Sequence, residues 1–172
     1  MAACVLVVLA LCLVPVNEAA AQDAREPAAE AAIELFKQAD PDLVEFFESA
    51  YGFAIFPGIS KGAVGVGGAH GKGLVYKGGE VVGRTSLTQF TVGFQLGGQV
   101  YQEVIFFEDE ASFNNFTGGN FELSAQASAI AAAAGVAANA TYRFGVAIFT
   151  LGKGGLMYEA SVGGQKFSFT PI

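Results

Sequence analysis

Glycine is distributed unevenly along this chain, and that distribution constrains the fold more than any other feature. All 23 glycines lie at or after Gly52 in a chain of 172 residues. Glycine weakens helices because it loses more conformational freedom on folding than any other residue. We therefore expect helices before Gly52 and short strands joined by tight turns after it, within one domain of ordinary size.

Residues 22–50 predict two amphipathic helices. Apolar side chains recur there at the i, i+3, i+4, i+7 spacing of a helix with one apolar face. The two stripes are Ala29, Ala32, Ile33 and Phe36, then Leu43, Phe46, Phe47 and Ala50. Asp40 and Pro41 are typical of the first positions of the second helix. Helices this short are marginal alone, so we expect both stripes to cover a sheet in the same domain.

Residues 51–172 predict mainly β structure. Apolar residues alternate with other residues over 90–96 and 121–129, which is the period of a strand with one buried face. Further candidate strands are 53–56, 63–69, 73–77, 100–107, 141–151, 156–162 and 166–170. The turn signals include Pro57-Gly58, Gly78-Gly79, Gly97-Gly98 and Gly118-Gly119. One short helix is expected after Asp109, with its phenylalanines toward the core.

These elements predict an α+β fold. We expect a mostly antiparallel, glycine-rich β-sheet or small barrel, with the two N-terminal helices packed on it. The helical part spans residues 22–50 and the mainly β part spans residues 51–172 of one domain.

The N-terminus predicts a signal peptide over residues 1–21. Val5–Val16 contains no charge and is too short to cross a bilayer, but it has the length of the apolar region of a signal peptide. Small residues offer a cleavage site near Ala21, which leaves the domain at 22–172. We therefore expect export to the periplasm or cell envelope.

Cleavage near Ala21 removes both cysteines, Cys4 and Cys12. The mature chain then has no thiol for a disulfide or for a cysteine metal site. Lipidation at Cys12 stays open, although Leu11 stands where the lipidation signal has a small residue.

Charge and motifs disfavour nucleic acid, catalysis and a metal centre. The net charge of −7 opposes binding to phosphate backbones. Gly58–Gly62 matches the G-x-S-x-G pattern, but the glycine-rich residues that follow cannot form the helix that a nucleophile elbow requires. His70 is the sole histidine, so an ordinary zinc site lacks its second imidazole. We expect no enzyme, no cofactor and no metal.

Basic residues of the β part are the candidate site. Several of them lie beside glycine-rich turns, where they could converge at one end of a sheet and meet anionic headgroups. The candidate headgroup contacts are Lys61, Lys72, Lys77, Arg143 and Lys153.

Four ordered glycine-rich blocks resemble the SYLF domain family. The blocks are residues 50–62 (AYGFAIFPGISKG), 65–73 (GVGGAHGKG), 93–99 (GFQLGGQ) and 154–164 (GGLMYEASVGG). Their order and spacing resemble that family from about residue 32 to residue 172. The resemblance implies a non-catalytic domain that contacts membrane lipids, and some members of the family bind actin.

The sequence departs from that family in two respects. Its N-terminal helices are acidic where eukaryotic members have a basic helix, and the export signal separates it from actin. The favoured function is therefore peripheral binding of membrane lipids in the envelope. A periplasmic structural or protein-interaction domain with an envelope protein partner is the alternative, and a small outer-membrane barrel is less favoured.

Overall fold

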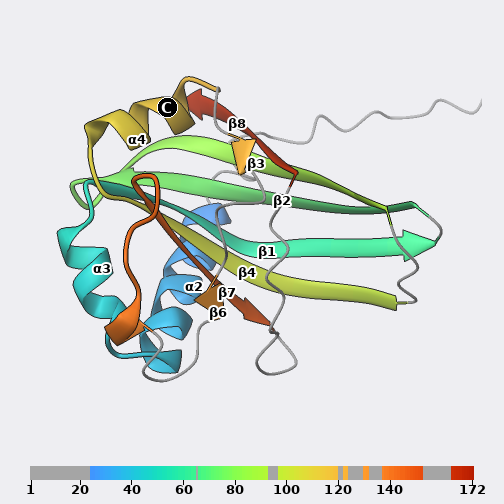
Figure 1. Ribbon diagram of the computed structural model, residues 1–172, viewed down its shortest axis with the longest axis horizontal. Coiled ribbons are helices and arrows are strands. Elements are labelled where there is room, and N and C mark those ends of the chain that lie inside the picture. Colours follow the sequence, from blue (N-terminus) through green and yellow to red (C-terminus); the bar gives the residue numbers. More distant parts are fainter. Residues whose placement is uncertain are drawn as a thin grey trace, which may run out of the picture.

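The computed structural model describes residues 24–64, 66–92, 97–119, 122–123, 130–131, 137–152 and 164–172. Within these residues the chain forms three α-helices, one 3-10 turn (η1) and one eight-stranded sheet (Figure 1). The helices are α2 (Arg25–Ala39), α3 (Leu43–Ser49) and α4 (Glu110–Thr117), and η1 is Ala137–Asn139. The strands are β1 (Gly52–Val64), β2 (Val66–Lys77), β3 (Glu80–Val92), β4 (Gly97–Phe107), β5 (Glu122–Leu123), β6 (Ile130–Ala131), β7 (Val146–Gly152) and β8 (Gln165–Pro171).

The strand order is β5-β8-β3-β2-β1-β4-β7-β6. All pairs are antiparallel except β6 with β7. The described sheet is open, because β5 and β6 form its two edges. The predicted α+β class and mostly antiparallel sheet are therefore confirmed. Of the two predicted forms, the structure has the open sheet and not the small barrel.

The two N-terminal helices pack on one face of the sheet, as their stripes predict. Ala29, Ala32 and Phe36 of α2 are fully buried, and α2 contacts β1 and β2. Phe47 of α3 meets Phe106 edge-on, with ring centroids 4.8 Å apart. Helix α3 begins at Leu43, later than expected. Asp40 precedes it in the connection, where its buried carboxylate accepts from the Asp42 and Ala137 amides at 3.2 and 2.8 Å.

Helix α4 covers the opposite face. The Asp109 carboxylate caps it by accepting from the Ser112 hydroxyl and from the Ser112 amide, the latter at 2.8 Å, and these hydrogen bonds lower the pKa of Asp109. Phe113 and Phe116 are buried against the sheet. The helix ends at Gly118, so this prediction of a capped helix is confirmed.

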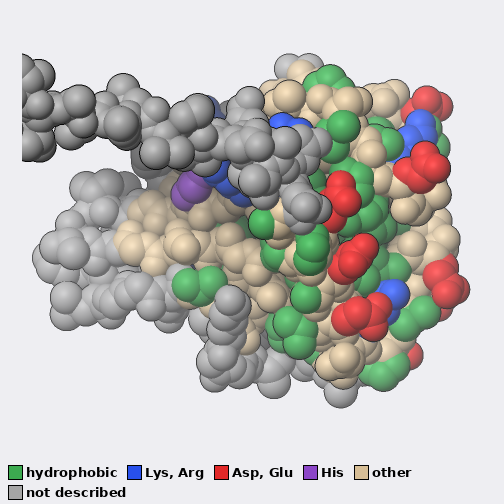
Figure 2. Space-filling model, turned by 180° about the vertical axis from the view of Figure 1, so that it is seen from behind, with side chains coloured by type: hydrophobic (Ala, Val, Ile, Leu, Met, Phe, Trp, Pro, Cys, Tyr) green, Lys and Arg blue, Asp and Glu red, His purple; other side chains and the backbone are tan. Residues whose placement is uncertain are grey.

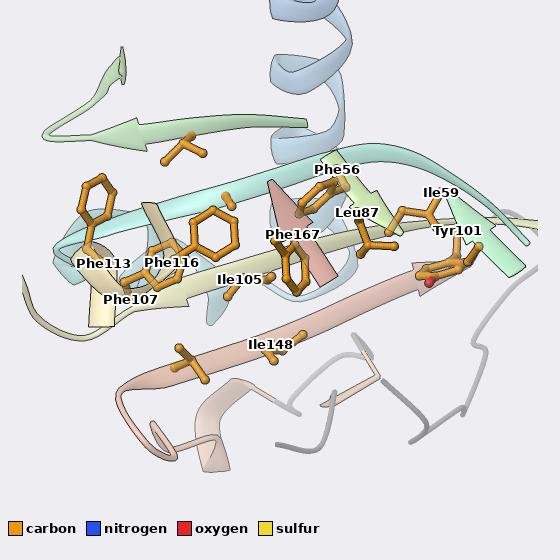
Figure 3. Packing of buried hydrophobic residues seen from close by; sticks show 14 residues of the cluster. Phe56, Ile59, Leu87, Tyr101, Ile105, Phe107, Phe113, Phe116, Ile148 and Phe167 are labelled. Carbon is orange, nitrogen blue, oxygen red and sulfur yellow. The ribbon is translucent and has the colours of Figure 1, made fainter. Parts of the chain in front are cut away.

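The sheet curves strongly around the α4 side. β4 and β8 are separated by three strands, so a flat sheet would hold them about 19 Å apart. Yet the Gln165 side-chain amide of β8 donates to the Glu103 carboxylate of β4 at 3.1 Å. The ring centroids of Phe167 of β8 and Phe56 of β1 also lie 5.8 Å apart (Figure 3). The α4 side is therefore a concave interior filled by aromatic and aliphatic side chains.

Two turn predictions are wrong. Pro57-Gly58 lies inside β1, at a shift of register between Ile55 and Ile59, because this long strand bends there instead of reversing. Gly97-Gly98 likewise begins β4 and pairs with β1. Gly78-Gly79 does form a turn, and both glycines have positive φ. Most of the strands expected over 121–129 and 156–162 lies outside the described residues.

Candidate functional site

The strands extend beyond the helices and leave part of their convex side open. His70 and Lys72 of β2 are exposed, whereas Leu74 and Tyr76 of the same strand are buried in the cluster that includes residues of α2 and α3. Because alternate side chains of a strand share a face, all four lie on the helix side of the sheet. The helices thus cover one end of this face and leave His70 and Lys72 uncovered.

Strands β3 and β8 continue the same face. Lys72 lies opposite Ser86, and Ser86 lies opposite Ser168, with the two hydroxyls 2.7 Å apart. His70 lies opposite Thr88, which lies opposite Lys166. We name this surface the open strand face; its residues are His70, Lys72, Arg84, Ser86, Thr88, Lys166 and Ser168.

Charge on the open strand face is mainly positive. Lys72 and Lys166 are exposed, and Arg84 is half-buried. The Nε atom of Arg84 has no hydrogen-bond partner among the described residues. Glu122 of the edge strand β5 lies opposite Lys166 in the register, which places an acidic residue beside this face. A surface of cations and hydroxyl donors of this kind suits phosphate or carboxylate groups.

The acidic residues lie elsewhere. The helices carry exposed acidic side chains at Glu26, Glu30, Glu34, Glu45, Glu48 and Glu110, and the exposed Asp42 directly precedes α3. Figure 2 shows acidic side chains over the helices at the right, and the histidine with basic side chains beside it over the strands toward the left. The molecule therefore separates its charges between the helices and the open strands.

The structure does not bring the five predicted basic residues together. Lys72 lies on the open strand face, but Lys61 of β1 is only 8% exposed and belongs to the concave side. Lys77 and Arg143 lie near the other end of the sheet, where β2 ends and β7 begins. Lys153 lies outside the described residues. Their role as headgroup contacts stays a prediction.

Lys77 is held by aromatic rings. Its ammonium lies 4.7 Å from the centroid of Tyr51 and 5.6 Å from that of Phe113. A hydrogen bond with the Tyr51 side chain raises the pKa of Lys77. Glu80 lies directly opposite Lys77 in the register. Lys77 therefore has Glu80, Tyr51 and Phe113 as neighbours at this end of the sheet.

A buried polar pair lies inside the curve of the sheet. Glu103 and Gln165 are both fully buried, and within the described residues the other carboxylate oxygen of Glu103 has no hydrogen-bond partner. Burial raises the pKa of Glu103 to about 7, although the hydrogen bond from Gln165 opposes that shift.

A second exposed feature, the turn before β7, was not expected from the sequence. Arg143 and Val146 exchange backbone hydrogen bonds of 2.9 and 3.1 Å around Phe144 and Gly145. Phe144 has a φ of 53° and is 80% exposed. This left-handed conformation costs a side-chain-bearing residue about 1–2 kcal/mol. The sequence pattern over 141–151 predicted one continuous strand and therefore missed this turn. Gly145, directly after Arg143 and Phe144, was the sequence signal that could have indicated it.

The G-x-S-x-G match does not have the structure of a nucleophile elbow. Ser60 of the G-x-S-x-G match lies inside β1, so no helix follows it as a nucleophile elbow requires. No described group of three or more His, Cys, Asp or Glu side chains is placed to hold a metal ion. Helices of the described part are all too short or too polar to cross a bilayer.

Comparison with known proteins gives two matches. A family model described as "Ysc84: Las17-binding protein actin regulator" matches residues 88–170, from the end of β3 through β8. Beta cell expansion factor A of Aeromonas veronii is 31% identical over 140 residues, which is 80% of this chain and 52% of that protein. The chain thus spans about half the length of that relative. These matches agree with the glycine-rich blocks: residues 88–170 of the chain match the model of the Ysc84 family, also called SYLF.

Proposed function

We propose that this chain is an exported, non-catalytic module that binds membrane lipids at the surface of the envelope. The match to the Ysc84 family model points to actin regulation, and the resemblance to the SYLF family implies lipid binding. The signal peptide expected over residues 1–21 favours lipid over actin, because an exported bacterial protein meets membranes and not an actin cytoskeleton.

The separation of charge is the observation that carries this proposal. Lys72 and Lys166 are exposed on the uncovered strands, with the half-buried Arg84 on the same face, whereas six exposed acidic residues lie on the helices. A chain with a net charge of −7 approaches an anionic bilayer more favourably with such a face toward the bilayer and its acidic helices turned away. Each base near an anionic surface contributes about 1 kcal/mol.

Charge reversal on the open strand face tests the proposal. Lys72→Glu should weaken binding to phosphatidylglycerol-containing vesicles at least about fivefold, because it removes one favourable contact and adds a repulsive one. Binding of the unaltered chain should fall with added salt and be weak for pure phosphatidylcholine. Co-sedimentation measures both effects.

Lys37→Glu is the matched control. Lys37 lies on α2 beside Glu34, so the same change of charge on the acidic side should leave binding nearly unchanged. Equal effects of the two variants would contradict the assigned face. Absence of binding to any vesicle would contradict lipid binding and favour a protein partner.

A further inference from the structure

Phe144 is in a position that the fold does not explain. At 80% it has the highest exposed fraction of the large hydrophobic residues in the described part, above Ile172 at 62%. It is also the only described non-glycine residue with positive φ. Asparagine or glycine would adopt this backbone more easily and expose less apolar surface. Strained residues of this kind tend to occur where a protein makes a functional contact.

The turn beneath Phe144 is firmly held. Besides the two bonds between Arg143 and Val146, the carbonyl of Gly145 accepts from the Glu108 amide at 2.9 Å. A Cβ atom on Gly145 would lie 2.8 Å from the Ser112 hydroxyl, so the turn sits close against the start of α4. The ring is therefore presented by an ordered backbone, which reduces the entropy lost on binding.

The surroundings of Phe144 favour a bilayer over a protein partner. Arg143 precedes it in the chain, and Glu108 and Asp109 lie beside Gly145 of the same turn; all three charged residues are exposed. A protein hot spot needs a surrounding rim that excludes water, and the described residues here supply none that is apolar. A bilayer interface needs no matching surface. It accepts an aromatic ring while an adjacent arginine stays among the headgroups.

We propose that the turn Arg143–Gly145 is a membrane-inserting tip. Phe144 enters the apolar edge of the bilayer and Arg143 contacts phosphate groups at its surface. The inference rests on the proposed lipid-binding function, and it adds a contact that differs in kind from the open strand face. That face acts through charge, whereas the tip acts through apolar burial.

A single tryptophan tests the insertion directly. The chain contains no tryptophan, so Phe144→Trp places one reporter at the tip. With vesicles of phosphatidylethanolamine and phosphatidylglycerol, its emission should shift to the blue and be quenched by brominated lipids. Leu35→Trp, at a 45% exposed position on α2, is the control and should show neither change. The inference is overturned if the Phe144→Trp variant sediments with the vesicles while its emission stays unshifted and unquenched.

Removal of the ring gives the second test. Phe144→Asn should lower the partition of the chain onto the same vesicles about 5–10-fold, as expected for partial burial of one phenyl ring. Its melting temperature should stay equal or rise, because asparagine tolerates this backbone. Leu35→Gln should leave the partition unchanged. If Phe144→Asn binds the vesicles as well as the unaltered chain does, membrane insertion of this turn is contradicted, whereas the proposed lipid binding is not. If the unaltered chain binds no vesicles, the proposed function fails and the inference with it.

Discussion

At the scale of single residues, Glu103 shows how burial changes an ordinary carboxyl group. It lies inside the curve of the sheet with one hydrogen bond, from Gln165, and with no exposed surface. The interior disfavours its charged form, which raises its pKa from 4.5 to about 7. Near neutral pH the folded protein therefore holds a proton that the unfolded chain releases.

This proton makes stability depend on pH in a predictable direction. The folded pKa lies above the unfolded value, so the contribution of Glu103 is most favourable below about pH 4.5 and declines until about pH 7. The decline amounts to about 3 kcal/mol. Glu103→Gln should remove this decline in the free energy of unfolding, because glutamine does not titrate. The variant should therefore be more stable than the unaltered chain at pH 8 and about equally stable at pH 4.

Urea unfolding at both pH values measures this difference, with Glu80→Gln at an exposed position as the control. The burial argument for Glu103 fails if the variant and the unaltered chain differ in unfolding free energy by the same amount at pH 4 and at pH 8.

At the scale of elements, the glycines within strands have two different roles. A Cβ atom on Gly73 of β2 would collide with the Ile55 carbonyl oxygen and lie 2.9 Å from the Phe56 ring. Both neighbours belong to β1, just before its shift of register. By contrast, a Cβ atom on Gly62 of β1 would meet nothing within 4 Å. Gly73 is thus required by close approach of two strands, whereas Gly62 is not.

Two alanine substitutions separate these roles. Gly73→Ala should lower the free energy of unfolding by about 1–3 kcal/mol, because β1 must move to admit the methyl group. Gly62→Ala should leave stability equal or raise it by up to about 1 kcal/mol, since alanine restricts the unfolded chain. Chemical denaturation compares the two directly, and similar losses in both would contradict the distinction.

At the scale of the whole molecule, the described fold is compatible with removal of the predicted signal peptide. Its first helix begins at Arg25, after the expected cleavage near Ala21, so every described helix and strand would remain. The remaining chain would also keep the charge separation between the helices and the open strand face, because all the residues involved lie beyond Ala21.

Processing can be measured on the exported chain. In a bacterial host, the form recovered from the periplasm should have the mass of a chain that begins at or near Gln22. Ala21→Asp should block cleavage by removing the small residue at the site, whereas Ala24→Asp should not. Recovery of the chain uncleaved, or from the cytoplasm alone, would contradict export.

Local patterns in the sequence determined the helical elements and some of the turns. The stripe that ends at Phe36 defines α2, and Asp109 with Gly118 defines the limits of α4. Each depends on residues within a few positions of one another, so no knowledge of the rest of the fold is needed. The family resemblance was also available, because its blocks are contiguous stretches of sequence.

The tertiary structure alone decided which side of the sheet each basic residue occupies. Lys61 and Lys72 stand next to similar glycine-rich stretches, yet the curve of the sheet buries Lys61 and leaves Lys72 open. That curve depends on contacts between distant strands, such as Glu103 with Gln165, and no local pattern encodes them. The strained turn at Phe144 was hidden for a related reason, because its backbone is fixed by Glu108 and Ser112 of another part of the chain. Sequence therefore determined the helices, some of the turns and the family resemblance, and packing between strands distant in sequence determined the surfaces.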